Sequence, residues 1–309
     1  METANTGRSP ASRYFSPGLA ARTTAATVDL EDATVAYWRY EPERAAPDTR
    51  TILVIHGFRG DHHGLLRVAD LLPDTRIIMP DLPGFGASTA FRTGEHSVAG
   101  YGRFIAEFLA ALDLGPDTVL LGHSFGSIVA AHFVANHPGA VTPLILVNPI
   151  AAPALEGRKG IMTRLAVLYY MLAARLPSGP GHALLRSPLI VRVMSGAMAK
   201  TRDRELRRFI HGQHRAYFSA FASRDSLLES FRASVGSHVA EVAGSLALPV
   251  LLIAGEKDEI AALPDQRRLA VLLPDAELKV IPGVGHLIHY ETPEPAARLI
   301  RSFLKDHPA

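Results

Sequence analysis

The sequence contains no cysteine among its 309 residues. The fold therefore has no disulfide framework, no thiolate nucleophile and no metal site built on cysteine. This composition is typical of a reducing compartment, so we expect a cytoplasmic protein.

Surplus charge and long apolar runs are also lacking. The chain has 32 basic and 30 acidic residues and no dense basic stretch, so we expect no nucleic-acid binding. The longest strongly apolar helical run, Leu165 to Ala174, has ten residues. A membrane-spanning helix needs about 20 residues, so we expect no stable membrane insertion. Residues 1–26 lack the apolar centre of a secretory signal, and we expect them to form a flexible tail.

Apolar residues are abundant, at 48% of the chain, which is enough for one large core or for a core with a small accessory unit. Short runs rich in β-branched and apolar residues predict strands, and helical patterns lie between most of them. This alternation predicts a mostly parallel sheet covered on both faces. The predicted strands are residues 34–40, 51–55, 76–79, 118–121, 144–147, 250–254 and 278–281.

The alternation stops between about residues 150 and 245. Helical patterns without a buried-strand run fill this stretch, and glycine and proline interrupt them, as in Pro177 to Gly181. We expect a core made of residues 27–149 and 246–309, with residues 150–245 forming a helical cap. In open α/β sheets, ligands bind beyond the carboxyl ends of the strands, where this cap would lie. The predicted cap helices are residues 162–176, 188–198, 203–221 and 225–235.

The strongest chemical signal is the pentapeptide Gly122-His123-Ser124-Phe125-Gly126. It matches G-x-S-x-G, and it directly follows a predicted strand and precedes a predicted helix, as the nucleophile elbow requires. The two glycines relieve crowding at the sharp turn, and the positive end of the following helix faces the serine oxygen. The alternative is a glycine-rich turn with an incidental serine. The strand and helix on either side favour Ser124 as a nucleophile.

A serine hydroxyl needs a base to remove its proton. His286 follows the last predicted strand and is our candidate for that base. Asp258 follows the strand at residues 250–254 and is our candidate for the acid that orients the histidine, with Glu256 as its rival. The order serine, aspartate, histidine along the chain is the order that the motif predicts.

Two backbone N–H groups are candidates for an oxyanion hole. One belongs to Phe125, the residue after the nucleophile. The other belongs to Phe58, in the loop His56-Gly57-Phe58-Arg59-Gly60 that follows the strand at residues 51–55. Glycine on both sides of that position lets the backbone approach a ligand closely.

No cofactor or metal site is predicted. The segment from Asp81 to Ser88 is glycine-rich but lacks the spacing of a nucleotide-binding loop, so we expect Asp81 and Ser88 to hold the loop by hydrogen bonds. His62 and His63 are adjacent and are expected to diverge. The pair His211 and His214 is expected on one helical face, without an H-E-x-x-H motif.

These motifs together resemble the α/β-hydrolase superfamily, over about Val28 to Leu304. The resemblance implies an eight-stranded, mostly parallel sheet with a helical cap inserted after the sixth strand. It also supports Ser124, Asp258 and His286 as a catalytic triad. Within the superfamily, the sequence is most similar to carboxylesterases and to carbon–carbon bond hydrolases of aromatic degradation. The motifs that carry the resemblance are His56-Gly-Phe58, Asp81-Leu-Pro-Gly-Phe-Gly86, Gly122 to Gly126, Gly255-Glu-Lys-Asp258 and Gly285-His286.

Departures from the superfamily narrow the chemistry. Epoxide hydrolases and haloalkane dehalogenases of this fold use an aspartate nucleophile, so the serine disfavours both activities. Asn148 follows the strand at residues 144–147, and this disfavours an acid relocated to that strand. The loop after residue 55 also lacks the His-Gly-Gly-Gly of one lipase group.

We expect hydrolysis of a small to medium, moderately apolar carboxylic ester through an acyl-enzyme. Arg59, Tyr169, Met171 and Phe218 are candidate substrate contacts. One alternative is carbon–carbon bond hydrolysis of a diketone-like substrate, with Arg59 or Arg192 binding a carboxylate. Acyl transfer or perhydrolysis is another, and a non-catalytic ligand receptor is disfavoured by the complete triad. The expected partner is a small-molecule substrate, and a homodimer is left open.

Overall fold

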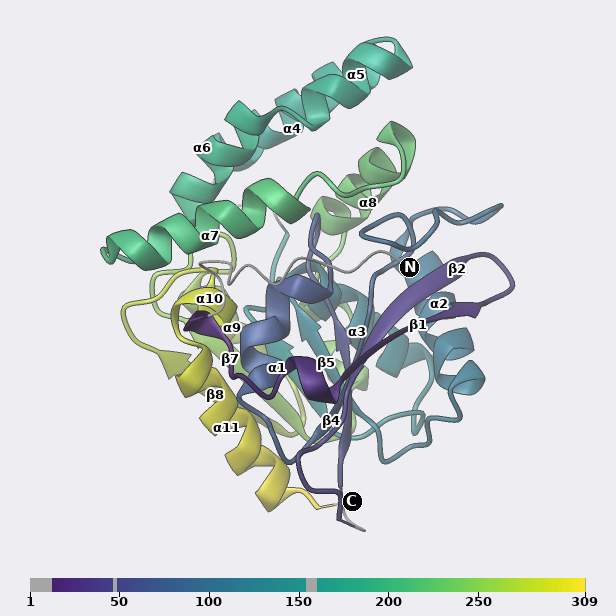
Figure 1. The fold of residues 1–309 in the computed structure, drawn as a ribbon, viewed down its shortest axis with the longest axis vertical. Helices are drawn as coiled ribbons and strands as arrows, with labels where there is room; N and C mark the ends of the chain where they lie inside the picture. Colours follow the sequence, from purple (N-terminus) through teal and green to yellow (C-terminus); the bar gives the residue numbers. More distant parts are fainter. Residues whose placement is uncertain (1–12, 47–48, 154–159, 309) are drawn as a thin grey trace.

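An eight-stranded sheet forms the centre of the computed structural model, which describes residues 13–46, 49–153 and 160–308 (Figure 1). Its strand order is β1-β2-β4-β3-β5-β6-β7-β8. Strand β2 pairs antiparallel with β1 and β4, and all other neighbours pair parallel. The sheet is thus mostly parallel, as predicted. The strands are β1 (Thr23–Asp29), β2 (Thr34–Tyr40), β3 (Thr51–Ile55), β4 (Arg76–Pro80), β5 (Val119–His123), β6 (Leu144–Val147), β7 (Val250–Gly255) and β8 (Ala276–Ile281).

Helices cover both faces of the sheet, and the sheet separates the core into two layers. In β3, Leu53 and Ile55 point into one layer, whereas Ile52 and Val54 point into the other. This alternation follows from the two-residue period of a strand and explains why the central strands are apolar throughout. Helices α2 and α3 bury their apolar sides in the first layer, and α1 and α11 bury theirs in the second. The core helices are α1 (Leu66–Asp70), α2 (Val98–Ala111), α3 (Phe125–Asn136), α9 (Leu263–Leu272), α10 (Ile288–Glu291) and α11 (Pro293–Asp306).

In the described part of the chain between β6 and β7 lie five α-helices, which we call the insert helices. They gather beyond one end of the sheet, with α4, α5 and α6 outermost and α7 and α8 nearer the sheet (Figure 1). Four correspond to predicted helices, but α5 falls where the sequence predicted only a break. Pro180 is compatible with α5 because it lies in the first turn, where its missing N–H is not needed. The insert helices are α4 (Gly160–Arg175), α5 (Ser178–Leu185), α6 (Pro188–Met198), α7 (Arg204–Tyr217) and α8 (Arg224–Gly236).

The N-terminal segment differs from the predicted flexible tail. Strand β1 begins at Thr23 and pairs with β2 along its whole length, and Leu19 is buried in the second core layer. The predicted boundary at residue 26 is therefore wrong, while residues 1–12 lie outside the described residues. The strand was missed because its sequence has little apolar character, as is normal for an edge strand with an exposed face.

Candidate active site

Ser124 occupies a strained turn between β5 and α3. Its backbone angles are φ 54° and ψ −120°, a conformation that costs a non-glycine residue on the order of 1–3 kcal/mol. Its N–H donates to the carbonyl of Val147, at 3.1 Å. Between residues 118 and 131 every residue is buried except Ser124, which is partly exposed. The strained turn therefore presents one hydroxyl at the surface of an otherwise buried strand–helix junction.

The two glycines of the pentapeptide are required by close backbone contacts. A methyl group at Gly122 would lie 2.4 Å from the carbonyl oxygen of Gly126. At Gly126 it would lie 2.1 Å from the carbonyl oxygen of Ile55, at the end of β3. Both distances are far below van der Waals contact, and the obstructing atoms are backbone. The elbow can therefore pack against β3 only if both positions lack a side chain.

We expect Gly126→Ala to destabilise the fold by about 1–3 kcal/mol or more, because the methyl group must displace backbone. The matched control is Gly212→Ala at an exposed position of α7, where a methyl group meets no atom within 4 Å. That change should raise stability by up to ~1 kcal/mol, the helix-propensity gain of alanine over glycine. Urea unfolding monitored by circular dichroism measures both. Equal midpoints for Gly126→Ala and the wild type would contradict the packing argument.

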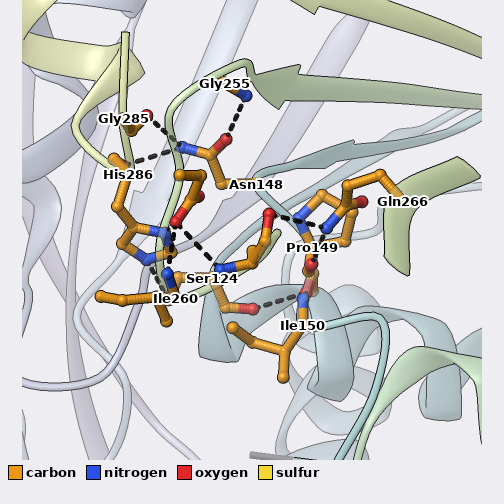
Figure 2. A network of polar contacts seen from close by, with 12 residues as sticks. Ser124, Asn148, Pro149, Ile150, Gly255, Ile260, Gln266, Gly285 and His286 are labelled. Carbon is orange, nitrogen blue, oxygen red and sulfur yellow. Dashed lines mark hydrogen bonds and ion pairs between the residues drawn. The ribbon is translucent and has the colours of Figure 1, made fainter. Parts of the chain in front are cut away.

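The predicted residues Ser124, His286 and Asp258 are hydrogen-bonded in series. The Ser124 hydroxyl lies 2.8 Å from Nε2 of His286 (Figure 2), and Nδ1 of the same ring lies 2.7 Å from Oδ2 of Asp258. The histidine comes from the loop after β8 and the aspartate from the loop after β7. The rival carboxylate, Glu256, is exposed and accepts a hydrogen bond from the N–H of Gly283 instead. Three loops at one sheet edge thus meet at a single imidazole.

Asp258 is held as an oriented carboxylate. Its Oδ1 accepts hydrogen bonds from the N–H groups of Ile260 and Ala261, at 2.8 and 2.9 Å. Burial acts to raise its pKa, but the charge and hydrogen bond of His286 and the two N–H donors together lower the pKa below its usual value. The group is therefore ionised near neutral pH, with its second oxygen directed at the imidazole.

Asn148 ties together the loops that carry the acid and the histidine (Figure 2). This residue follows β6, is fully buried and has a positive φ of 45°. Its Oδ1 accepts from the N–H of Gly255 at 2.9 Å, and its Nδ2 donates to the carbonyl of His286 at 2.8 Å. A polar residue directly after a buried strand is the only sign of this structural role in the sequence, from which we predicted no more than the absence of an acid at this position.

The two oxyanion candidates belong to chain segments that lie close to Ser124. Phe125 opens α3, so its N–H has no partner within the helix. The loop that carries Phe58 also approaches the nucleophile, because a methyl group at Gly57 would lie 3.1 Å from Cβ of Ser124. Across the described ranges, neither the Phe58 nor the Phe125 N–H forms a hydrogen bond outside a helix or strand. Both N–H groups therefore lie close to Ser124 and are free to donate to an oxyanion.

His56 fixes the position of the Phe58 loop. Its Nε2 accepts from the N–H of Leu82 at 2.8 Å, while its Nδ1 lies 2.9 Å from the carbonyl of Gly57 and donates to it. Burial lowers the pKa of this histidine, which keeps the ring in the neutral form that can both accept and donate. The neighbouring loop is held as predicted, because Asp81 accepts from the N–H of Ala87 and Ser88 donates to the carbonyl of Asp81.

His123, inside the pentapeptide, does not compete with His286 as a base. It is buried, and its ring packs against the rings of His286 and His289. Burial, followed by the nearby charge of His286, lowers its pKa to about 3. The ring therefore stays neutral and weakly basic near neutral pH.

A second serine–histidine cluster joins α6 to α7. The Ser195 hydroxyl lies 2.6 Å from Nδ1 of His211 and 2.7 Å from Nδ1 of His214. The serine is buried in the middle of a helix, and burial lowers the pKa of His214 to about 3. Within the described ranges, neither histidine is hydrogen-bonded to a carboxylate. The cluster lacks an exposed hydroxyl and an orienting acid, so it serves to hold the two helices together.

The rings of His62 and His63 do not diverge, contrary to the prediction. Their centroids lie 3.9 Å apart, and with Asp61 they offer possible ligand atoms within 4.8 Å of one another. These groups are already engaged, because His62 bonds to Asp81 and His63 to Asp61. Trp38 stacks on the free face of His62, and the cluster lies in the short 3-10 turn that follows the Phe58 loop.

Arg59 does not present its charge to a ligand. Its side chain is 2% exposed and donates to the carbonyls of Phe218 and Leu185 and to the hydroxyl of Tyr170, at 3.0, 2.7 and 3.1 Å. It therefore pins the insert helices to the Phe58 loop. The sequence could not reveal this anchoring role, because all three acceptors are distant along the chain. Contact of Arg59 with substrate stays a prediction.

The other predicted substrate contacts have their own partners. Met171 is 44% exposed, the hydroxyl of Tyr169 donates to the carbonyl of Leu184, and the ring of Phe218 stacks on His214. An aromatic cluster that the sequence did not suggest packs around Phe58 instead. Ring centroids of Phe85, Tyr170 and Phe231 lie 5.8–6.1 Å from the Phe58 ring. This cluster brings α4 and α8 against the loop beside Ser124.

Comparison with known proteins finds similar hydrolases that align with nearly the whole chain. A family model described as "Alpha/beta hydrolase family" matches residues 52–299. Poly(3-hydroxyalkanoate) depolymerase from Ectopseudomonas oleovorans is 26% identical over 280 residues, covering 90% of this chain and 92% of that protein. Lipase 3 from Moraxella sp. (strain TA144) is 24% identical over 263 residues, covering 82% and 76%. The solved structure of a thermophilic esterase from Thermogutta terrifontis superposes with a TM-score of 0.74 at 21% identity, covering 93% of this chain and all of the esterase.

Proposed function

The chain belongs to the alpha/beta hydrolase family, and on that premise we propose that it hydrolyses a small to medium, moderately apolar carboxylic ester. The observation that carries the proposal is the position of His286, hydrogen-bonded to the Ser124 hydroxyl and to Asp258. A hydroxyl, a base and an orienting acid in this series are the requirements for acyl transfer to serine.

The proposed reaction has two halves. Oγ of Ser124 attacks the ester carbonyl while Nε2 of His286 removes the hydroxyl proton, and the N–H groups of Phe58 and Phe125 bind the oxyanion. The tetrahedral intermediate collapses, His286 gives the proton to the leaving alkoxide, and the alcohol departs. A water molecule then gives a proton to His286 and attacks the acyl-enzyme. His286 returns that proton to Oγ of Ser124 as the acid is released. Each oxyanion donor is expected to contribute about 3 kcal/mol to transition-state stabilisation.

The substrate class is argued from the groups near Ser124. Phe58, Phe85, Tyr170 and Phe231 form an apolar cluster beside the nucleophile, which favours an apolar acyl or alcohol group. Relatives named as a lipase and an esterase agree with this class. Carbon–carbon bond hydrolysis would need a cation for the substrate carboxylate. The guanidinium of Arg59 is already used by the insert helices, and Arg192 is exposed on α6.

We also propose that residues 150–245 act as a cap over a core that runs from β1 to residue 149 and continues over residues 246–309. The contacts of Arg59 and Phe58 with the insert helices support this division, since they join α4, α5 and the end of α7 to the loop beside Ser124. A cytoplasmic location and a homodimer stay predictions.

The proposal is tested with p-nitrophenyl esters of graded acyl length, from acetate to dodecanoate. We expect turnover that is highest for short to medium chains, because the apolar side chains beside Ser124 come from a closely packed cluster. Diketone substrates serve as the comparison for carbon–carbon cleavage. Absence of turnover on every ester, or faster cleavage of the diketones, would refute ester hydrolysis as the main activity.

Asn148→Ala is expected to lower kcat by about 10- to 100-fold with little change in KM, because the loops carrying Asp258 and His286 lose their shared anchor. The matched control is Asn136→Ala, since Asn136 is exposed and only caps the carbonyl of His132. Steady-state kinetics on one ester measures both. Wild-type kcat in the Asn148 variant would show that the triad keeps its geometry without this residue.

A further inference from the structure

Helix α4 is apolar on its exposed side as well as on its buried side. At 100° per residue, Leu165, Leu168, Met171 and Leu172 fall within about a third of the helix circumference, and all four are exposed. Tyr170 and Ala173, on the opposite side, are buried in the core. A surface helix normally directs polar residues to water, whereas the exposed side of α4 carries large apolar side chains.

Helix α6 repeats the pattern in the same outer layer (Figure 1). Leu189 and Val193, one turn apart, are exposed, while Val191 on the other side is buried. Six of the ten large exposed hydrophobic residues in the described ranges lie on α4 and α6. We call these six residues, which are Leu165, Leu168, Met171, Leu172, Leu189 and Val193, the outer apolar face.

The same stretch of chain carries only positive charge. Between residues 157 and 202 there is no aspartate or glutamate, whereas the chain as a whole is nearly balanced, at 30 acids and 32 bases. Arg164 and Arg175 fall on the exposed arc of α4, and Arg192 lies between Leu189 and Val193 on α6. None of these three arginines forms an ion pair with any residue in the described part of the chain. Their charges are therefore available to an external anion.

We propose that the outer apolar face binds the surface of a membrane rich in anionic phospholipid. An interfacial helix combines leucines that enter the acyl boundary with arginines that reach the phosphate groups, and α4 and α6 have this composition. Among the described residues no helix is long and apolar enough to cross a bilayer, so the contact is peripheral. A second copy of the chain is a poorer occupant, because a two-fold contact would bring the unpaired arginines of both copies together.

The test is sedimentation of the full-length protein with vesicles of phosphatidylcholine alone or of phosphatidylcholine mixed with phosphatidylglycerol. We expect binding to the mixed vesicles, weak binding to the neutral ones, and release at ~1 M salt, where charges are screened within about 3 Å. Arg164→Gln with Arg175→Gln should lower the partition coefficient by about 30-fold, from roughly 1 kcal/mol for each arginine.

A matched pair of variants separates the outer apolar face from general hydrophobicity. Leu168→Glu with Leu172→Glu, at positions 60% and 51% exposed, should abolish vesicle binding. Val271→Glu with Leu272→Glu, at positions 85% and 53% exposed on α9, should leave it unchanged. Circular dichroism of all variants checks that each one is folded.

Four results would overturn the proposal. These are absence of binding to mixed vesicles, equal binding to both kinds of vesicle, retained binding by the Leu168 and Leu172 variant, and loss of binding in the α9 control. Light scattering that reveals a dimer dissociated by the Leu168 and Leu172 changes would instead assign the face to a second copy of the chain. Vesicle binding is measured without turnover, so its failure is distinguishable from failure of the ester hydrolase proposal.

Discussion

Replacing Ser124 with alanine is expected to lower kcat/KM for a p-nitrophenyl ester by on the order of 10⁴- to 10⁶-fold. The change removes one partly exposed oxygen that is hydrogen-bonded to His286. No core packing is lost, so the melting temperature should stay close to that of the wild type. The residual rate reflects water attack assisted by the oxyanion donors and substrate binding alone. Steady-state kinetics and thermal unfolding of the same preparation measure the two effects.

Ser195→Ala is the decisive control for this prediction. Ser195 also contacts two histidines, but it is buried and serves to join α6 to α7. Its loss should reduce stability slightly and leave turnover near the wild-type level. Full turnover in the Ser124 variant together with loss of turnover in the Ser195 variant would indicate that the nucleophile is Ser195, in the insert helices.

Asp258→Asn is expected to lower kcat by on the order of 10⁴-fold with a small change in KM. An amide at this position cannot match the imidazolium charge that forms when His286 takes the serine proton. The N–H donors of Ile260 and Ala261 would direct the amide oxygen to themselves and its NH₂ group to Nδ1. The ring would then carry its proton on Nε2, facing the serine, which is the wrong tautomer for a base.

Glu256→Gln is the matched control for the aspartate. Glu256 lies two residues away, is exposed, and binds the N–H of Gly283 rather than the imidazole. We expect this variant to retain turnover within a few-fold of the wild type. A larger loss of kcat in the Glu256 variant than in the Asp258 variant would indicate that Glu256, and not Asp258, orients the histidine.

The parts of the fold that follow from local pattern were predictable from the sequence. The central strands are apolar runs because both faces of the sheet are covered, and seven of the eight could be located within a few residues. Strand β1 was missed because its stability comes from pairing with β2 and its residues carry no apolar pattern. Helix α5 was missed because glycine and proline in its first turn are breaking signals only when they stand inside a helix.

The candidate site was predictable where the chemistry requires a residue type at a strand end. Ser124, Asp258 and His286 each follow a parallel strand, and such ends share one edge of the sheet. Asn148 and Arg59 have roles that depend on partners far apart in the chain, so their contacts had no local signature. The side of α4 that faces the core could not be predicted either, because apolar residues occur on both sides of the helix. Met171, a predicted substrate contact, is exposed on the outer apolar face.

The role of Ser124 as the nucleophile is tested most directly by finding where a serine-directed inhibitor attaches. The protein is treated with a fluorophosphonate until ester turnover stops, digested, and analysed by mass spectrometry. We predict one adduct for each chain, on the peptide containing Ser124, and no adduct in the Ser124→Ala variant. An adduct at Ser195 or at any other residue, or inhibition without an adduct on Ser124, would contradict this role.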